Sequence, residues 1–353
     1  MGWLRELSVD QQISLLFVMV FGALGLVTLG AFFFSLRERN SSAAARDLRF
    51  KRDLRAAWLG AAVFWLSWVS GPLGATLLFG LLSFLALREF ITLMHTRRSD
   101  HRSLLAAFFV VLPLQYALVG NRNFDLFTVF IPVYAFIAIP VISALAGDPE
   151  RFLERNAKIQ WGIMVCVFGL SHAPALLLLD FPQHAGQGAF LVFFLVVVAM
   201  VAQVTQEALS RWLRRRPLAR AISRSFSWRA WMLGALVGAL AGAALYWITP
   251  FKPWQAFAMG LIAGGSGLLG EFVMKALKKD VGVRFWGNRT LTHEMPDGST
   301  ITAGSDSAGA LAGSSLSQAG LTGAVGLLDR IAPLAFAAPV FFHSVRWYFQ
   351  LRG

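Results

Sequence analysis

The sequence predicts an all-α, polytopic integral membrane protein of about ten transmembrane helices. Of its 353 residues 56% are hydrophobic and only 14% are charged, a composition outside the usual range of soluble proteins. Its apolar runs are long enough to cross a hydrocarbon core of roughly 30 Å. The Lys and Arg residues gather in alternate loops between these runs, as the positive-inside rule describes for membrane proteins.

Ten apolar runs follow one another along the chain. The first, near 12–36, leads into the basic flank "FFFSLRERN" and has no small-residue cleavage site, so we expect an anchor helix and not a signal peptide. The second and third, 57–71 and 73–90, are short and divided only by "SGPLG", which predicts a tight helical hairpin or a re-entrant pair. The others lie near 104–120, 124–146, 159–179, 187–209, 230–248, 254–277 and 328–349.

The basic loops predict the orientation of these helices. With ten crossings, every basic loop faces the cytoplasm and both termini lie outside. The basic loops are 37–56, 97–102, 147–158, 210–229 and 278–327. The net charge of +13 is therefore explained by membrane topology, and we expect no nucleic-acid partner.

Small residues recur where helices must approach closely. Gly234, Gly238 and Gly242 repeat every four residues, the spacing that lets two helix backbones meet in lipid. The stretch "AGGSGLLGE" has the glycines of a nucleotide-binding loop, but it lies in a span and lacks a preceding strand and a Walker lysine. We expect helix packing at both places.

Two groups of charged residues stand at cytoplasmic membrane edges. Glu271, Lys275 and Lys278 share one helix face, because steps of four and three residues return to the same side. Asp329 and Arg330 begin the last span. Carboxylates from two helices suit Mg²⁺, and lysines beside them suit phosphate oxygens, which together predict phosphoryl or nucleotidyl transfer. The alternative is that the lysines only flank the span on its cytoplasmic side, and that Asp329 and Arg330 form an ion pair at the membrane interface.

These residues carry a family resemblance. "GEFVMKALKKDVGV" and the later "GLLDRIAPLAFAAPVFF" resemble the C-terminal signature of bacterial phosphatidate cytidylyltransferases, the CDP-diacylglycerol synthases, and the likeness covers most of residues 57–350. The resemblance implies a multi-pass protein of the bacterial inner membrane. It also implies an enzyme that joins CTP and phosphatidate, releases pyrophosphate and uses Mg²⁺ in a polar cavity facing the cytoplasm.

The resemblance implies roles for individual residues. Two acids that match family metal-binding positions are expected to serve catalysis, and a third acid nearby is a further candidate metal ligand: Asp280, Asp329 and Glu271. Positions that match the family's basic pair, terminal arginine and upstream serine are expected to bind substrate: Lys278, Lys279, Arg330 and Ser223.

The sequence departs from the family at several polar positions. Residues of other types stand where the family has acids, namely Gln206, Phe285, Arg229 and Ala332. Two hypotheses therefore stay open. One is CTP:phosphatidate cytidylyl transfer; the other is a catalytically degenerate homologue that binds a lipid or stabilises a membrane partner. A homodimer is a further possible assembly.

The chain divides into two parts in this prediction. Residues 1–56 form an anchor helix and a basic loop, and residues 57–353 form the cytidylyltransferase-like transmembrane domain. Within that domain, residues 285–322 are a cytoplasmic insertion rich in Gly, Ser and Ala. Its "MPDGSTITAG" predicts a β-hairpin with Asp297–Gly298 as the turn, followed by a linker. A lid, a docking site and a tolerated insertion are all compatible with this composition.

Overall fold

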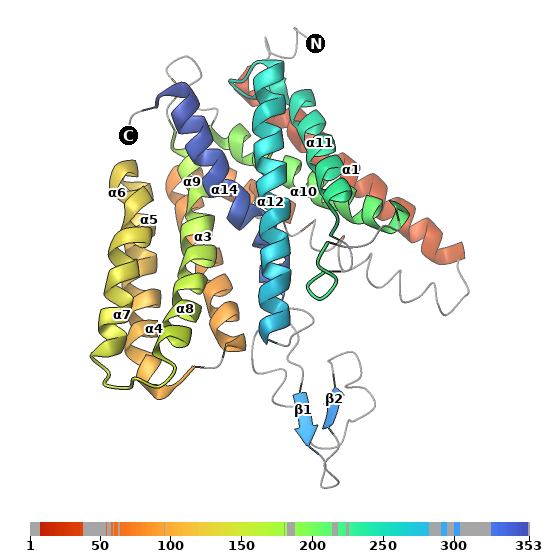
Figure 1. The fold of residues 1–353 in the computed structure, drawn as a ribbon. Coiled ribbons are helices and arrows are strands. Elements are labelled where there is room, and N and C mark those ends of the chain that lie inside the picture. Colours follow the sequence, from red (N-terminus) through yellow and green to blue (C-terminus); the bar gives the residue numbers. More distant parts are fainter. Residues whose placement is uncertain are drawn as a thin grey trace.

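The fold is a helical bundle built for a membrane (Figure 1). The computed structural model describes residues 8–37, 54, 58, 60–62, 64–94, 96–179, 181, 188–213, 218–223, 226–281, 291–294, 300–303 and 326–351. Seven helical stretches in this part of the chain are long and apolar enough to cross a membrane. The predicted class, a helical polytopic membrane protein, is confirmed.

Each of the seven stretches coincides with one of the apolar runs of the sequence. Three of them contain a π-helical turn, namely η3, η4 and η5. The stretches are α1 (Val9–Arg37), α3 (Gly71–Leu93), η2–α4–η3–α5 (Arg98–Asp100, His101–Ala106, Ala107–Val111, Leu112–Gly120), α6–η4–α7 (Phe124–Val129, Phe130–Ala135, Phe136–Ala144), α8–η5–α9 (Phe152–Gly162, Ile163–Gly169, Leu170–Leu177), α10 (Gly188–Leu213) and α12 (Pro253–Val281).

The three remaining apolar runs also form helices, but these are not among the seven. A helix over Gly60–Val69 ends before α3, and Gly71, with φ +67°, marks the break that "SGPLG" predicted. Helix α11 (Trp228–Ala244) has 17 residues; at about 1.5 Å each they cover about 26 Å, less than the ~30 Å of a hydrocarbon core. A single 3-10 turn, η6 (Tyr246–Ile248), follows it. Helix α14 (Leu327–Phe349) contains two prolines and charged residues near both ends.

The predicted hairpin of the insertion is present. Strand β1 (Leu291–Glu294) pairs antiparallel with β2 (Thr300–Ala303), with Leu291 opposite Ala303 and Glu294 opposite Thr300. The predicted turn, Asp297–Gly298, lies outside the described residues, as does most of 285–322. Figure 1 shows the hairpin below the C-terminal end of α12.

Glycines let α14 pack closely between α9 and α12. A Cβ added at Gly169 would lie 2.3 Å from the backbone oxygen of Ala335. A Cβ at Gly270 would lie 2.2 Å from the Cβ of Phe336. These distances are too short for any larger side chain without movement of α14, so the two glycines fix the position of this helix.

The glycine repeat of α11 serves the packing that its spacing predicted. A Cβ on Gly234 or Gly238 would lie within 3 Å of atoms of α10, and one on Gly242 would lie 2.9 Å from Phe194 of α10. On the α12 side, the added Cβ of Gly260 would lie 3.0 Å from Ala239. Helix α11 is therefore held tightly between α10 and α12, as expected for small residues at helix crossings in lipid.

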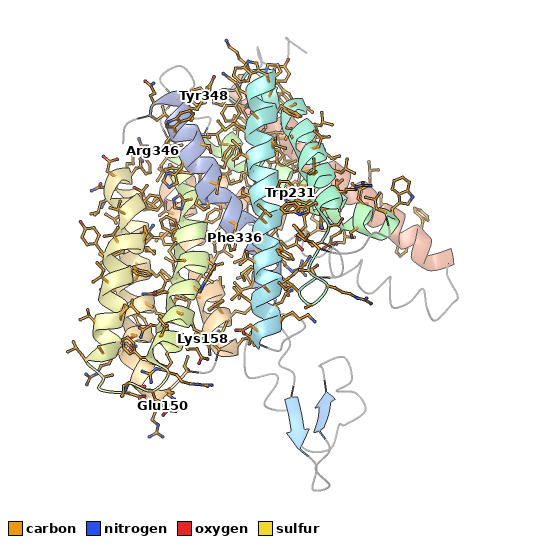
Figure 2. The ribbon with its side chains drawn as sticks, viewed as in Figure 1. Glu150, Lys158, Trp231, Phe336, Arg346 and Tyr348 are labelled. Atoms are coloured by element: carbon orange, nitrogen blue, oxygen red, sulfur yellow. The ribbon has the colours of Figure 1, made fainter. Side chains whose placement is uncertain are left out.

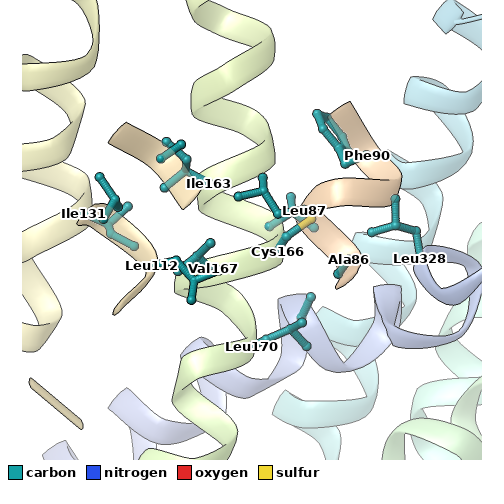
Figure 3. Close-up of a cluster of buried hydrophobic side chains, with 14 of the residues drawn as sticks. Ala86, Leu87, Phe90, Leu112, Ile131, Ile163, Cys166, Val167, Leu170 and Leu328 are labelled. Carbon is teal, nitrogen blue, oxygen red and sulfur yellow. The ribbon is translucent and has the colours of Figure 1, made fainter. Parts of the chain in front are cut away.

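A buried apolar cluster joins α3, α8–η5 and the first turns of α14. Phe90, Leu87 and Cys166 are fully buried in it, and so is Leu328, the second residue of α14 (Figure 3). Cys166 is a free cysteine and serves as a packing residue in this cluster. The cluster fixes the N-terminal end of α14 against α3.

Most of the ion pairs among the described residues lie at one end of the bundle. At one end, here called the basic end, lie the C-terminal end of α12 and the loops 94–100 and 145–151; the start of α1 and the end of α14 lie at the other end (Figure 1). Figure 2 shows Glu150 and Lys158 at the basic end and Arg346 and Tyr348 at the opposite one. This arrangement agrees with the orientation expected from the loops.

An ion-pair network ties the loops of the basic end together. Arg155, whose side chain is 4% exposed, lies 3.0 Å from Asp100 and also pairs with Asp148. Arg97 binds Glu150 through two parallel hydrogen bonds of 2.5 and 2.6 Å. The bidentate geometry fixes both loops. The guanidinium of Arg97 is thus bound by Glu150 of the same chain.

Candidate functional site

The candidate site lies where α12 ends and α14 begins, at the basic end. Helix α12 carries the predicted charged face. Glu271 is 7% exposed. Lys275 follows it by one helical turn, and the Nζ of Lys275 lies 2.6 Å from the Oε1 of Glu271. The pair follows the favourable order of an acid four residues before a base. Lys278 lies on the same face in the last turn, where a cation also complements the helix dipole.

Lys278 joins this face to α14. Its Nζ donates a hydrogen bond to Oδ1 of Asp329, in the first turn of α14, and the side chains are 16% and 25% exposed. The contact spans 51 positions in the sequence. Two charged groups that the sequence placed at the cytoplasmic membrane edge, on two different helices, are thus in direct contact.

Glu89 of α3 is a site residue that sequence reasoning missed. Its carboxylate is buried, 4% exposed, and accepts hydrogen bonds from the backbone N–H groups of Leu327 (3.1 Å) and Leu328 (3.2 Å). These are the first two residues of α14, whose capping position, Gly326, supplies no side-chain bond. A signal was present, because an acid in the apolar stretch "LLSFLALREFITLM" is rare in a membrane span.

Three of the predicted residues are exposed at the edge of the site. Lys279, Asp280 and Arg330 make no hydrogen bond or ion pair within the described part of the chain. Asp280 follows Lys278 by two residues, about 200° around the helix at about 100° per residue. Since Lys278 contacts Asp329, Asp280 lies on the side of α12 turned away from that contact. The structure therefore brings Asp329 to Lys278, and not to Asp280.

Ser223 lies in the segment before α11, which packs on α12. Ser223 is buried, and the segment is closed by a hydrogen bond from the N–H of Leu218 to the oxygen of Phe226. The ring of Phe226 stacks on Phe272 of α12, with centroids 4.2 Å apart. This stacking holds the Ser223 segment beside the part of α12 that carries Glu271.

The positions where the family has acids have different environments here. Ala332 is 2% exposed and lies in the apolar cluster with Leu328. Gln206 is buried on α10 against α11, where its Cβ would be 2.8 Å from a Cβ on Gly234. Arg229 is exposed in the first turn of α11. Phe285 lies outside the described residues.

The donor atoms of the site are compatible with Mg²⁺ but few in number. Among the described residues there is no group of three or more His, Cys, Asp or Glu side chains that could hold a metal ion. Carboxylate oxygens are the ligands that Mg²⁺ prefers, and it is commonly held by one or two carboxylates together with phosphate oxygens of a substrate. Asp329 fits that pattern if Lys278 moves aside.

Comparison with known proteins gives two matches. The sequence profile of the cytidylyltransferase family matches residues 50–293, a range that includes Ser223, Glu271 and Lys278 and ends before Asp329. The protein named "Uncharacterized protein YnbB" of Escherichia coli (strain K12) is 33% identical over 294 residues, which cover 82% of this chain and 85% of that protein. The second match extends beyond a single motif to most of both chains.

Proposed function

The chain belongs to the cytidylyltransferase family, and on that premise we propose that it transfers CMP from CTP to phosphatidate. The products are CDP-diacylglycerol and pyrophosphate. The observation that carries the proposal is the contact between Lys278 of α12 and Asp329 of α14, beside Glu271 and Lys275. Two lysines and two acids come together there at one membrane edge, which supports a role in binding phosphate and a metal ion.

The reaction assigns a task to each charged group. Lys278, Lys279 and Arg330 bind phosphate oxygens of CTP and phosphatidate, and Ser223 donates a hydrogen bond to one of them. A phosphate oxygen of phosphatidate attacks the α-phosphorus of CTP. The bond from that phosphorus to the bridging oxygen breaks, and pyrophosphate leaves with the electron pair. Positioning and charge neutralisation supply most of the catalysis in such a transfer.

Mg²⁺ would neutralise charge on the phosphate oxygens when bound. Asp329 would hold it, with phosphate oxygens completing the coordination. Glu271 and Asp280 are the further expected ligands, and Asp280, on the other side of α12, joins them only if the last turn of α12 rotates toward α14. In the ligand-free arrangement Lys278 neutralises Asp329. Substrate binding therefore includes an exchange of partners, in which Lys278 leaves the carboxylate for a phosphate oxygen.

The alternative function is a degenerate homologue that binds a lipid or stabilises a membrane partner. The observation that favours it is the environment of Ala332, which lies buried among apolar side chains one turn after Asp329. An acid of the family's final motif is replaced there by a methyl group. In this alternative, the lysine and acid pairs stabilise the basic end and bind no nucleotide.

The membrane arrangement that goes with the proposal has ten spans. The seven long helices, α14, α11 together with the turn η6, and the apolar run 57–71 before α3 cross the membrane of a bacterial cell, the inner one where there are two, with the basic end in the cytoplasm. Residues 1–56 are the anchor and basic loop, residues 57–353 are the catalytic domain, and the insertion 285–322 belongs to the cytoplasmic side. A homodimer or a complex with another membrane protein is compatible with this arrangement.

The proposal is tested by incorporation of labelled CTP into lipid. The purified protein is incubated with phosphatidate, Mg²⁺ and CTP labelled at the α-phosphate. We expect labelled lipid with the wild-type protein and a loss of at least tenfold in Asp329→Asn and Asp280→Asn, since removing groups that act on transition-state charge commonly costs 10²–10³-fold. Glu150→Gln, at the same end but in the loop network, is the control. No label with phosphatidate or several other lipid acceptors favours the alternative.

A further inference from the structure

The first turn of α14 is capped by a side chain from another helix. A helix begins with N–H groups that have no partner within the helix, and Gly326, with φ +76°, supplies none by its side chain. Each oxygen of the Glu89 carboxylate accepts one of these N–H groups, from Leu327 and Leu328. The acid lies 238 positions earlier in the sequence, so the cap ties α14 to α3.

This cap determines where Asp329 lies. Leu328 and Asp329 are consecutive, and Leu328 is fully buried in the cluster that contains Phe90, the neighbour of Glu89 (Figure 3). The buried leucine fixes the depth of the turn, and the two hydrogen bonds fix its rotation. The Asp329 carboxylate then lies against Lys278. A carboxylate at a helix N-terminus is also favoured by the helix dipole.

We propose that Glu89 is a positioning residue that holds the first turn of α14 so that Asp329 can act at the end of α12. The catalytic part of this inference rests on the proposed function, whereas the positional part does not. A consequence is that the N–H groups of Leu327 and Leu328 are already bonded, so they do not bind phosphate as free helix N-termini often do. Phosphate binding falls to Lys278, Lys279 and Arg330.

Glu89→Gln is the most informative variant. Glutamine has the same size, but it offers one oxygen to one N–H group and turns an NH₂ donor toward the other. It therefore removes one hydrogen bond and the negative charge. Glu89→Asp keeps the charge but is one methylene shorter, and it serves as the second variant if the first does not fold. Glu150→Gln is the matched control, because Glu150 is also hydrogen-bonded at the basic end but belongs to another helix pair.

A cross-linking experiment tests the positional part without activity. Lys278→Cys and Asp329→Cys are introduced together with Cys166→Ala, and the rate of cross-linking by a short bis-methanethiosulfonate reagent, which replaces the length of the lost lysine side chain, is measured in monodisperse protein. We expect Glu89→Gln or Glu89→Asp to slow cross-linking by about tenfold, and Glu150→Gln to leave it unchanged. Equal rates in all backgrounds would overturn the inference.

A second readout tests whether the position matters for the reaction. Loss of folded protein lowers the maximal rate but does not change the Mg²⁺ concentration that gives half of it. Displacement of a metal-binding carboxylate raises that concentration. We expect a rise of about tenfold in Glu89→Gln, in line with the 10–100-fold effect of mutations around metal ligands. An unchanged value overturns the catalytic part. If the Glu89 variants slow cross-linking but the wild-type protein has no transferase activity at all, the positional inference stands and the proposed function is rejected.

Discussion

Lys278 and Asp329 form an ion pair whose side chains are mostly shielded from solvent. Removing one member of such a pair leaves the other charge poorly compensated and is commonly destabilising. The pair therefore contributes to stability whatever the protein's reaction is. A useful experiment must separate this contribution from the role in phosphate binding.

Substituting and exchanging the two residues separates the contribution to stability from the role in phosphate binding. Lys278→Met should lower the free energy of unfolding by about 1–3 kcal/mol, because Asp329 loses its lysine. The double exchange Lys278→Asp with Asp329→Lys restores an ion pair but opposes both helix dipoles, so its stability is compared with that of the two single exchanges. Its loss of stability should be smaller than the sum of their losses, and it should have no transferase activity, since the cation proposed to bind phosphate then lies on the other helix. Thermal unfolding in detergent and the labelled-lipid assay measure the two effects. A loss equal to the sum of the single losses would contradict the pairing.

The pKa of Asp148 predicts how the stability of the basic end changes at low pH. The hydroxyl of Ser99, the N–H of Glu150 and the guanidinium of Arg155 lower the pKa of Asp148 from 3.8 to about 2. Because the pKa is depressed in the folded protein, the stabilisation is complete above pH 4 and is lost as the pH falls from about 4 to about 2.

The corresponding measurement is thermal stability as a function of pH. We expect Asp148 to add no pH dependence between pH 5 and pH 8. Below pH 4 the wild-type protein should lose stability more steeply than Asp148→Asn, whose side chain does not titrate. Identical curves for the two proteins below pH 4 would show that this carboxylate has an ordinary pKa.

The residues of the candidate site differ in how far the sequence could predict their partners. The face formed by Glu271, Lys275 and Lys278 follows from helix periodicity alone, and the 2.6 Å pair within it is confirmed. The contact of Lys278 with Asp329 and the cap by Glu89 depend on tertiary packing of distant segments. No local pattern encodes such distances, so a single sequence does not predict them.

At the scale of helices, the sequence predicted the apolar middle of each element better than its ends. The predicted ninth run ended near 277, whereas α12 continues to Val281. Hydropathy marks the part of a helix that lies in lipid, and the charged last turn extends beyond it. This extension matters, because it places Lys278, Lys279 and Asp280 on a helix and so fixes their directions.

Gly169 tests how tightly α14 is packed. In Gly169→Ala the new Cβ would lie 2.3 Å from the backbone oxygen of Ala335, and a backbone atom of a packed helix cannot move aside cheaply. We expect a loss of about 1–3 kcal/mol of stability and reduced activity, because α14 carries Asp329. The control is Gly25→Ala on α1, where no atom lies within 4 Å of the added Cβ. Equal unfolding temperatures for the two variants would contradict the close packing.

At the scale of the whole molecule, charge distribution and fold agree. Two of the basic loops that the sequence assigned to one side of the membrane, 97–102 and 147–158, lie with the charged C-terminal end of α12 at one end of the bundle, and the start of α1 and the end of α14 lie at the other (Figure 1). What composition does not predict is which helices are neighbours. The neighbours are set by small residues, such as those of α11, and by buried polar contacts between helices.

Cysteine labelling tests the orientation directly. The native Cys166 is fully buried, so single cysteines can be added without removing it. Pro149→Cys lies at the basic end and Asn121→Cys lies in the loop between α5 and α6, and both positions are exposed. A membrane-impermeant maleimide applied to right-side-out vesicles should label position 121 and should reach position 149 only after permeabilisation. The reverse pattern would contradict the orientation.

The central claim is that the basic end transfers CMP, and the fate of two labels tests it most directly. Purified protein with phosphatidate and Mg²⁺ is given CTP labelled at either the α- or the γ-phosphate. Our account predicts α-label in the lipid, γ-label in pyrophosphate, and the loss of both signals in Asp329→Asn. Recovery of both labels in unreacted CTP with the wild-type protein would contradict it, and so would γ-label in free phosphate or in lipid.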